Sequence, residues 1–180
     1  MLLAQFLSFG RTSAATAQEF GYKVKQFELE RLGSVEYAQW QHPQETQKSI
    51  TQPIVDAVKQ FVREGDLVID IGAHTGDTTV PMALAAGASG LCLAFEPNPF
   101  VFKILSANAG LNPEKTNIRP HNFAATEKPG EFVFHYTDGN YCNGGFKSQQ
   151  KWPLFRRRHP LTVAGAQSLR PAEDRVPRVA

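Results

Sequence analysis

The clearest chemical pattern in this 180-residue chain is a glycine loop that follows an acid. Residues 68–76 read Val-Ile-Asp-Ile-Gly-Ala-His-Thr-Gly, so Asp70 ends an apolar run while Gly72 and Gly76 enclose three residues. Glycine permits a tight turn and a close backbone approach to a ligand, and the N–H groups at the start of a following helix favour an anionic group. The pattern indicates a ligand-binding loop.

The loop differs from the dinucleotide fingerprint. That fingerprint, G-x-G-x-x-G, carries an extra early glycine and makes room for a pyrophosphate, whereas this loop reads G-x-x-x-G after an acid. A carboxylate at the end of the strand suits a cationic ligand with an amino group, such as a sulfonium amino acid, better than a diphosphate. The pattern therefore disfavours an NAD-dependent oxidoreductase, and a loop that is only a turn remains an alternative.

A second acid, Glu96, follows the next apolar run, 26 positions after Asp70. A carboxylate at the end of the second strand can accept hydrogen bonds from both hydroxyls of a ribose. Two structural alternatives stay open, namely that Asp70 only caps the loop and that Glu96 is a solvated strand end. Two acids with a helical pattern between them nevertheless favour a nucleoside-containing ligand.

The elements that must position these residues alternate between strand and helix. Nearly continuous apolar runs predict strands covered on both faces, at 67–71 and 91–95, with a third strand within 117–124. Helical spacing predicts helices at 52–63, from Thr78 to 86 and at 100–109, the first capped by Thr46 or Ser49. Alternation at 131–136 predicts a strand with one wet face. This order is typical of an α/β fold with right-handed crossovers.

Three short segments together resemble the FkbM family of S-adenosylmethionine-dependent methyltransferases. They are Asp-Ile-Gly-Ala-His-Thr-Gly at 70–76, Ala-Phe-Glu-Pro-Asn at 94–98 and Asn-Phe-Ala-Ala at 122–125, within a match of about residues 50–146. The resemblance implies a Rossmann-like class I methyltransferase sheet with helices on both faces, present here as the first three core strands plus an added hairpin strand. It also implies methyl transfer to a hydroxyl of a small molecule, sugar or lipid.

The resemblance further implies which residues contact the cofactor. The glycine loop would hold the methionine part of S-adenosylmethionine, Glu96 the ribose hydroxyls, and residues 122–124 would border the adenine. The cofactor-binding residues expected on this basis are Asp70, Gly72, Ala73, His74, Thr75, Gly76, Glu96, Pro97, Asn98, Asn122, Phe123 and Ala124. Residues 138–146 would lie near the substrate mouth, and no catalytic base is identified.

The pattern divides the chain into an N-terminal segment (1–45), the cofactor-binding domain (46–146) and a basic tail (147–180). Family members continue past the hairpin into a fourth core strand with an acidic motif, which this sequence lacks. The tail holds eight Lys and Arg residues against two acids, resembles a shifted reading frame and is expected to be disordered. Without the fourth strand, 67–71 is expected to form an exposed apolar edge. A non-catalytic fragment or cofactor-binding module is therefore the alternative to an active enzyme.

Composition excludes several other classes of protein. A net charge of +2 and 42% hydrophobic residues are typical of a globular chain, and the arginines at 156–158 lack the interleaved aromatic residues of a nucleic-acid site. The two cysteines, Cys92 and Cys142, have no metal-binding spacing and suit a reducing cytoplasm. No apolar stretch is long enough to span a membrane, and the N-terminus lacks the basic region of a signal peptide. We expect no metal and no specific protein partner.

Overall fold

The computed structural model describes residues 19–126, 130–137, 140–146 and 158–165, with side chains described for 19–126. This part of the chain is a mixed α/β structure with three small sheets. A parallel sheet has the order β3-β4-β5, from β3 (Leu67–Ile71), β4 (Leu91–Phe95) and β5 (Ile118–His121). An antiparallel hairpin precedes it, made of β1 (Tyr22–Leu29) and β2 (Gly33–Trp40). An antiparallel sheet follows it in the order β7-β6-β8, from β6 (Gly130–Thr137), β7 (Asn140–Phe146) and β8 (Arg158–Gly165).

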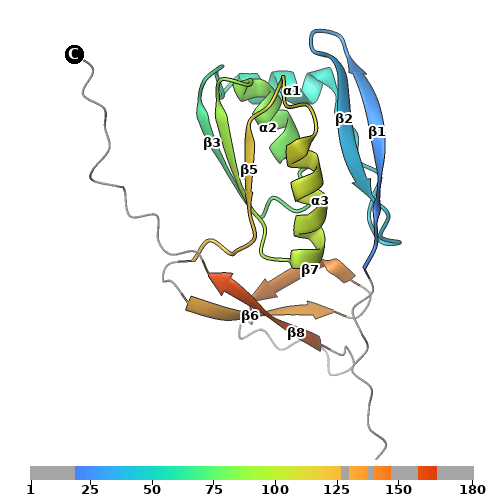
Figure 1. The fold of residues 1–180 in the computed structure, drawn as a ribbon, viewed down its shortest axis with the longest axis vertical. Coiled ribbons are helices and arrows are strands. Elements are labelled where there is room, and N and C mark those ends of the chain that lie inside the picture. The colour runs from blue at the N-terminus through green and yellow to red at the C-terminus, as the bar shows by residue number, and fades with distance from the viewer. Residues whose placement is uncertain (1–18, 127–129, 138–139, 147–157, 166–180) are drawn as a thin grey trace, which may run out of the picture.

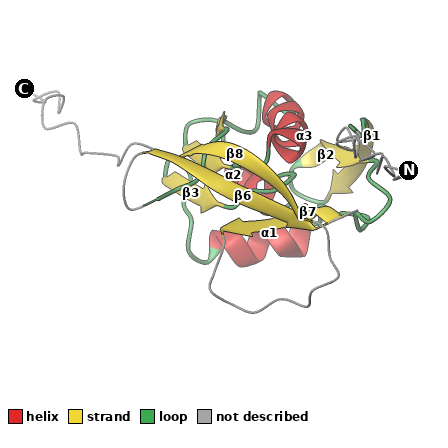
Figure 2. Ribbon diagram, turned by 90° about the horizontal axis from the view of Figure 1, so that it is seen from below, coloured by secondary structure: helices red, strands yellow, loops and turns green. Residues whose placement is uncertain are grey.

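Three helices fill the space between the parallel sheet and the hairpin (Figure 1). They are α1 (Gln52–Lys59), α2 (Thr79–Ala86) and α3 (Pro99–Gly110). The middle helix, α2, is apolar almost all round and almost wholly buried, as expected of a helix packed on several sides. The β6–β8 sheet lies beyond the carboxyl ends of the parallel strands, as the views in Figures 1 and 2 agree.

The parallel sheet is covered on one face only in the described residues, which corrects two expectations. Val68 and Asp70 point to the helices, whereas Leu67, Ile69 and Ile71 on the other face are 61%, 46% and 67% exposed. Neither the expected helices on both faces nor the expected double burial of this strand is therefore present. The expected edge is confirmed, because β3 pairs only with β4 within its sheet.

Other sequence predictions needed smaller corrections. The first helix ends at Lys59, not at Arg63, and its N-cap is Thr51 rather than Thr46 or Ser49. Helix α3 begins one residue early because the Asn98 side chain caps it, accepting hydrogen bonds from N–H groups of the first turn. Residues 140–146 form strand β7, and residues 158–165, expected in a disordered tail, form strand β8.

The hairpin is fixed to α3 and to the segment just after it by two asparagines that act as a neighbouring strand would. The carboxamide of Asn108 accepts from the Ala38 N–H (2.6 Å) and donates to the Ala38 carbonyl (3.1 Å). Asn112 makes the same pair of bonds with Glu36, at 2.8 and 2.9 Å. Asn108 lies in the last turn of α3 and Asn112 just after the helix, and alternate strand residues point their main-chain groups to the same side. These two side chains therefore satisfy the edge of β2 without a further strand.

We predict that Asn108→Ala lowers the free energy of unfolding by about 3 kcal/mol, because it leaves buried main-chain groups of Ala38 and Thr75 without partners. Asn117→Ala is the matched control, since Asn117 donates a single half-buried bond to the Gly90 carbonyl and its loss should cost about 1 kcal/mol. Urea denaturation measures both variants. Equal losses would contradict the structural role given to Asn108.

Candidate functional site

The carboxyl ends of β3, β4 and β5 bring the three expected segments together. The glycine loop follows β3, Glu96 follows β4, and residues 122–124 follow β5. Because the strands are parallel and in register, with Asp70 opposite Ala94 and Phe95 opposite His121, these segments meet at one edge of the sheet. Ligands of open α/β sheets bind at this edge. It is the candidate functional site of the chain.

Glu96 is the residue on which the three segments converge. One of its carboxylate oxygens, Oε2, accepts the N–H of His74 (2.9 Å), and the other, Oε1, accepts the N–H of Asn98 (2.8 Å). Its main-chain carbonyl accepts from Nδ2 of Asn122 (2.8 Å). The carboxylate is buried, and burial raises its pKa while the two N–H donors oppose that rise. Since each carboxylate oxygen accepts two hydrogen bonds, both retain capacity for another donor.

The glycine loop is folded onto β4 instead of presenting all its N–H groups to a ligand. The N–H groups of Gly72 and Ala73 both donate to the carbonyl of Phe95, at 2.9 and 3.0 Å, and that of His74 donates to Glu96. These three N–H groups are therefore already used within the protein, whereas the expectation that N–H groups at the start of the following helix favour an anion stays a prediction. The loop serves to hold the Glu96 carboxylate.

The two loop glycines have different functions. Both adopt positive φ angles, +81° at Gly72 and +97° at Gly76, which side chains other than glycine rarely adopt. A Cβ atom at Gly72 would meet nothing within 4 Å, whereas one at Gly76 would lie 3.2 Å from Leu105 Cδ1 on α3. Gly72 therefore leaves open space beside the loop, and Gly76 permits close packing of the loop against α3.

Asp70 is held by the protein itself. Its side chain is buried on the helix-facing side of β3, and Oδ2 accepts a hydrogen bond from the hydroxyl of Thr79 (2.7 Å), the first residue of α2. Burial raises the pKa of this carboxyl. This contact fits the structural alternative, in which Asp70 fixes the start of α2. Direct contact between Asp70 and a ligand stays a prediction.

Aromatic rings line the other end of the site. Phe95 stacks on His121 with ring centroids 5.1 Å apart, and Phe123 lies 5.4 Å from Phe95 and 5.3 Å from His121. Phe123 is half-buried, Ala124 is buried and Asn122 is exposed. A partly exposed ring beside two others offers a flat apolar surface, which is what a bound base requires.

Sequence reasoning missed a group of charged residues that reaches the loop from the segment after β2. Nε2 of His74 lies 3.9 Å from Oε2 of Glu45, and Nζ of Lys48 lies 3.2 Å from Oε1 of Glu45. The same Nζ lies 2.9 Å from Oδ2 of Asp77, the residue directly after the loop. The cluster joins two short segments, one with Glu45 and Lys48 and the other with His74 and Asp77, so no local pattern indicates it.

In the part of the chain that the structure describes, no group of three or more His, Cys, Asp or Glu residues could hold a metal ion. None of its helices combines the length and apolar character needed to cross a bilayer. Cys92 is a free, buried thiol whose pKa is raised by burial to about 12.

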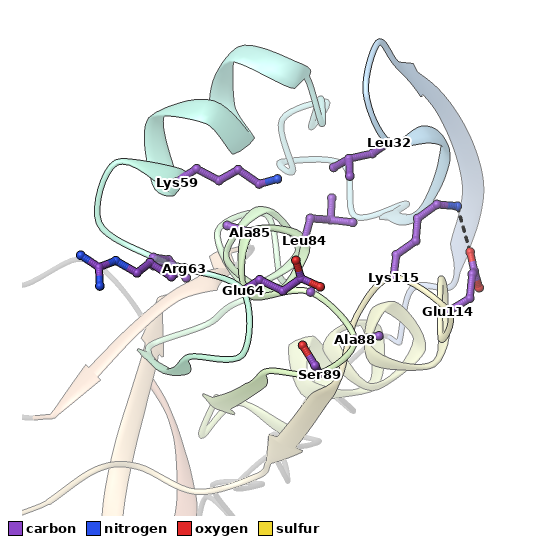
Figure 3. A pocket seen from close by; sticks show the side chains of 12 residues that line it. Leu32, Lys59, Arg63, Glu64, Leu84, Ala85, Ala88, Ser89, Glu114 and Lys115 are labelled. Atoms are coloured by element: carbon purple, nitrogen blue, oxygen red, sulfur yellow. Dashed lines mark hydrogen bonds and ion pairs between the residues drawn. The ribbon is translucent and has the colours of Figure 1, made fainter.

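A cavity of about 600 Å³ lies at the far end of α2, away from the strands' carboxyl ends. Its lining combines apolar side chains with charges of both signs, and it is formed by Leu32, Lys59, Val62, Arg63, Glu64, Leu84, Ala85, Gly87, Ala88, Ser89, Glu114 and Lys115. In Figure 3, Lys59 extends toward Leu32, Lys115 turns outward to Glu114, and Arg63 points away from the cavity. The cavity is open, and Lys115 is already paired with Glu114. It lacks the convergent polar groups of a binding site.

We predict that Gly76→Ala lowers stability more than Gly72→Ala does. Both substitutions force a side chain into a left-handed conformation, at about 1–2 kcal/mol each, but only the one at Gly76 also crowds Leu105. Thermal unfolding of the two variants checks the difference. If Gly72→Ala were the more damaging substitution, the packing function of Gly76 would be wrong.

Comparison of the chain with known proteins adds no relative to this description. No protein-family model matches it, and neither the curated proteins nor the solved structures include a significant match.

Proposed function

We propose that this chain binds S-adenosylmethionine at the carboxyl ends of β3, β4 and β5 and is a methyltransferase that resembles the FkbM family. One observation carries the proposal. The Glu96 carboxylate lies at the end of the second parallel strand, fixed by the N–H groups of His74 and Asn98, with acceptor capacity on both oxygens. Two adjacent ribose hydroxyls need a pair of acceptors in this position.

The surrounding residues fit the rest of the cofactor. The open space at Gly72 admits a ligand beside the loop, and the half-buried ring of Phe123 offers a surface for the adenine. Acidic residues around the loop suit a ligand with a sulfonium charge. S-adenosylmethionine, when bound, supplies an electrophilic methyl group. The residues of this chain bind and orient that group.

Methyl transfer to a hydroxyl is the reaction class that the resemblance supports. The acceptor oxygen must lie in line with the sulfonium methyl group, and a base must remove its proton. Such catalysis depends mainly on position, so a rigid loop that fixes the cofactor is the protein's main contribution. The acceptor proposed is a small molecule, a sugar or a lipid.

A cofactor-binding module without catalysis is the second candidate, and the β3 edge favours it. In the described residues β3 has no neighbour on its outer side, so no strand bounds the site beyond the glycine loop. Calorimetric titration with S-adenosylmethionine, S-adenosylhomocysteine and NAD, combined with a methyl-transfer assay on hydroxyl-bearing acceptors, separates the candidates. Binding without transfer supports the module, and preference for NAD contradicts both.

Glu96→Ala should weaken S-adenosylhomocysteine by about tenfold or more, because it removes charge-assisted hydrogen bonds to the ribose. Glu114→Ala is the control, since Glu114 is an exposed acid outside the site whose side chain pairs with Lys115. Isothermal titration measures both variants, and circular dichroism checks that each is folded. Unchanged affinity in a folded Glu96→Ala protein would contradict the ribose assignment.

The raised pKa of Glu96 predicts a pH dependence of binding. As pH falls through this pKa, the carboxylate gains a proton and loses acceptor capacity, so the affinity for S-adenosylhomocysteine should fall at a pH above the ordinary Glu range. Glu96→Gln cannot titrate and should lack this part of the profile. Identical profiles in both proteins would exclude Glu96 as the group responsible.

A further inference from the structure

The charged cluster at the glycine loop is built around a buried acid. The side chain of Glu45 is only 3% exposed, and its two oxygens face different side chains, the Lys48 ammonium at 3.2 Å and the His74 imidazole at 3.9 Å. Lys48 and His74 keep 21% and 23% of their side chains exposed. A buried carboxylate thus lies against the ammonium of Lys48 and the imidazole of His74, whose charge depends on protonation, and holds both side chains beside the loop.

Lys48 has donor capacity beyond its two acidic partners. An ammonium group has three N–H donors, and Glu45 and Asp77 accept from two directions. Asp77 directly follows Gly76, so the ammonium lies where the glycine loop meets α2. Its position is fixed by two acids, and the lysine is exposed enough to meet a ligand there.

His74 links this cluster to the proposed ribose acceptor. Its main-chain N–H donates to Glu96, whereas its ring lies between Glu45 and Trp40, the latter with ring centroids 6.2 Å apart. A ligand that lies along the loop with its ribose at Glu96 therefore extends toward Lys48. The remaining N–H donor of Lys48 calls for an acceptor oxygen at this point, and a carboxylate oxygen supplies one.

We propose that Lys48 binds the carboxylate of the ligand's amino-acid end and that Glu45 is the residue that positions Lys48. This inference rests on the proposed function and deepens it. The segment after β2 becomes part of the cofactor site and selects nucleosides that carry an amino acid over those that do not. Glu45 acts through Lys48 and His74 and makes no contact with the ligand.

Two ligands that share a nucleoside test this selectivity. S-adenosylhomocysteine carries the amino-acid end, whereas 5′-methylthioadenosine has the same adenine, ribose and thioether without it. Lys48→Met should weaken the first about tenfold or more and the second less than twofold, and Lys48→Arg should restore most of the loss. Lys59→Met is the matched control. It removes an exposed lysine at the end of α1, beside the cavity, and should change neither affinity.

The outcomes separate this inference from the proposed function. If the wild-type chain binds neither ligand, the proposed function fails. If it binds both and Lys48→Met weakens them equally, or leaves both unchanged, the assignment of Lys48 is overturned. If Lys48→Met does not fold, the wild-type protein tests the same point with a ligand that lacks the carboxylate. Decarboxylated S-adenosylhomocysteine should bind about tenfold more weakly than the intact ligand, and equal affinity would contradict the proposal.

Discussion

The carboxylate of Glu96 is the interaction on which the arrangement of the site depends. A buried anion is costly unless hydrogen bonds compensate it, and here two N–H groups from different segments do so. One comes from the glycine loop after β3 and the other from the turn before α3. The side chain of Asn122 binds the carbonyl of the same residue. One residue at the end of β4 therefore sets the positions of the segments that follow all three parallel strands.

A second constraint comes from the edge of the hairpin. Main-chain groups of β2 face α3, and Asn108 and Asn112 satisfy them with side-chain amides. Asn108 also donates to the carbonyl of Thr75, and the hydroxyls of Tyr37 and Thr75 are 2.8 Å apart. These buried bonds connect the hairpin directly to the glycine loop. The segment after β2, with Glu45 and Lys48, is consequently held beside the loop.

Local pattern was enough to predict the parallel strands and the grouping of their carboxyl ends. The runs at 67–71 and 91–95 are strands with those bounds, because β-branched and apolar residues fit a pleated sheet wherever it lies. The same runs could not show which face of the sheet is covered by helices, since the sequence pattern of apolar residues is the same whether or not a helix packs on them. Ile69 and Ile71 are exposed for that reason.

The unpredicted parts of the site depend on contacts between distant residues. Glu45 and His74 are 29 positions apart, and Asn108 and Ala38 are 70 apart, so neither pair leaves a local signal. The alternation of apolar Val35 and Tyr37 with polar residues after Gly33 is a local sign of the hairpin. The alternation shows a strand, but only the fold shows that it packs on α3.

Amide chemical shifts during titration with S-adenosylhomocysteine test the central claim most directly. The account predicts saturable shifts at His74 and Asn98, because their N–H groups donate to the carboxylate that would bind the ribose. The amides of Ala88 and Ser89, at the cavity beyond the far end of α2, should stay unchanged. Shifts confined to that cavity, or no saturable shift at His74 and Asn98, would contradict the account.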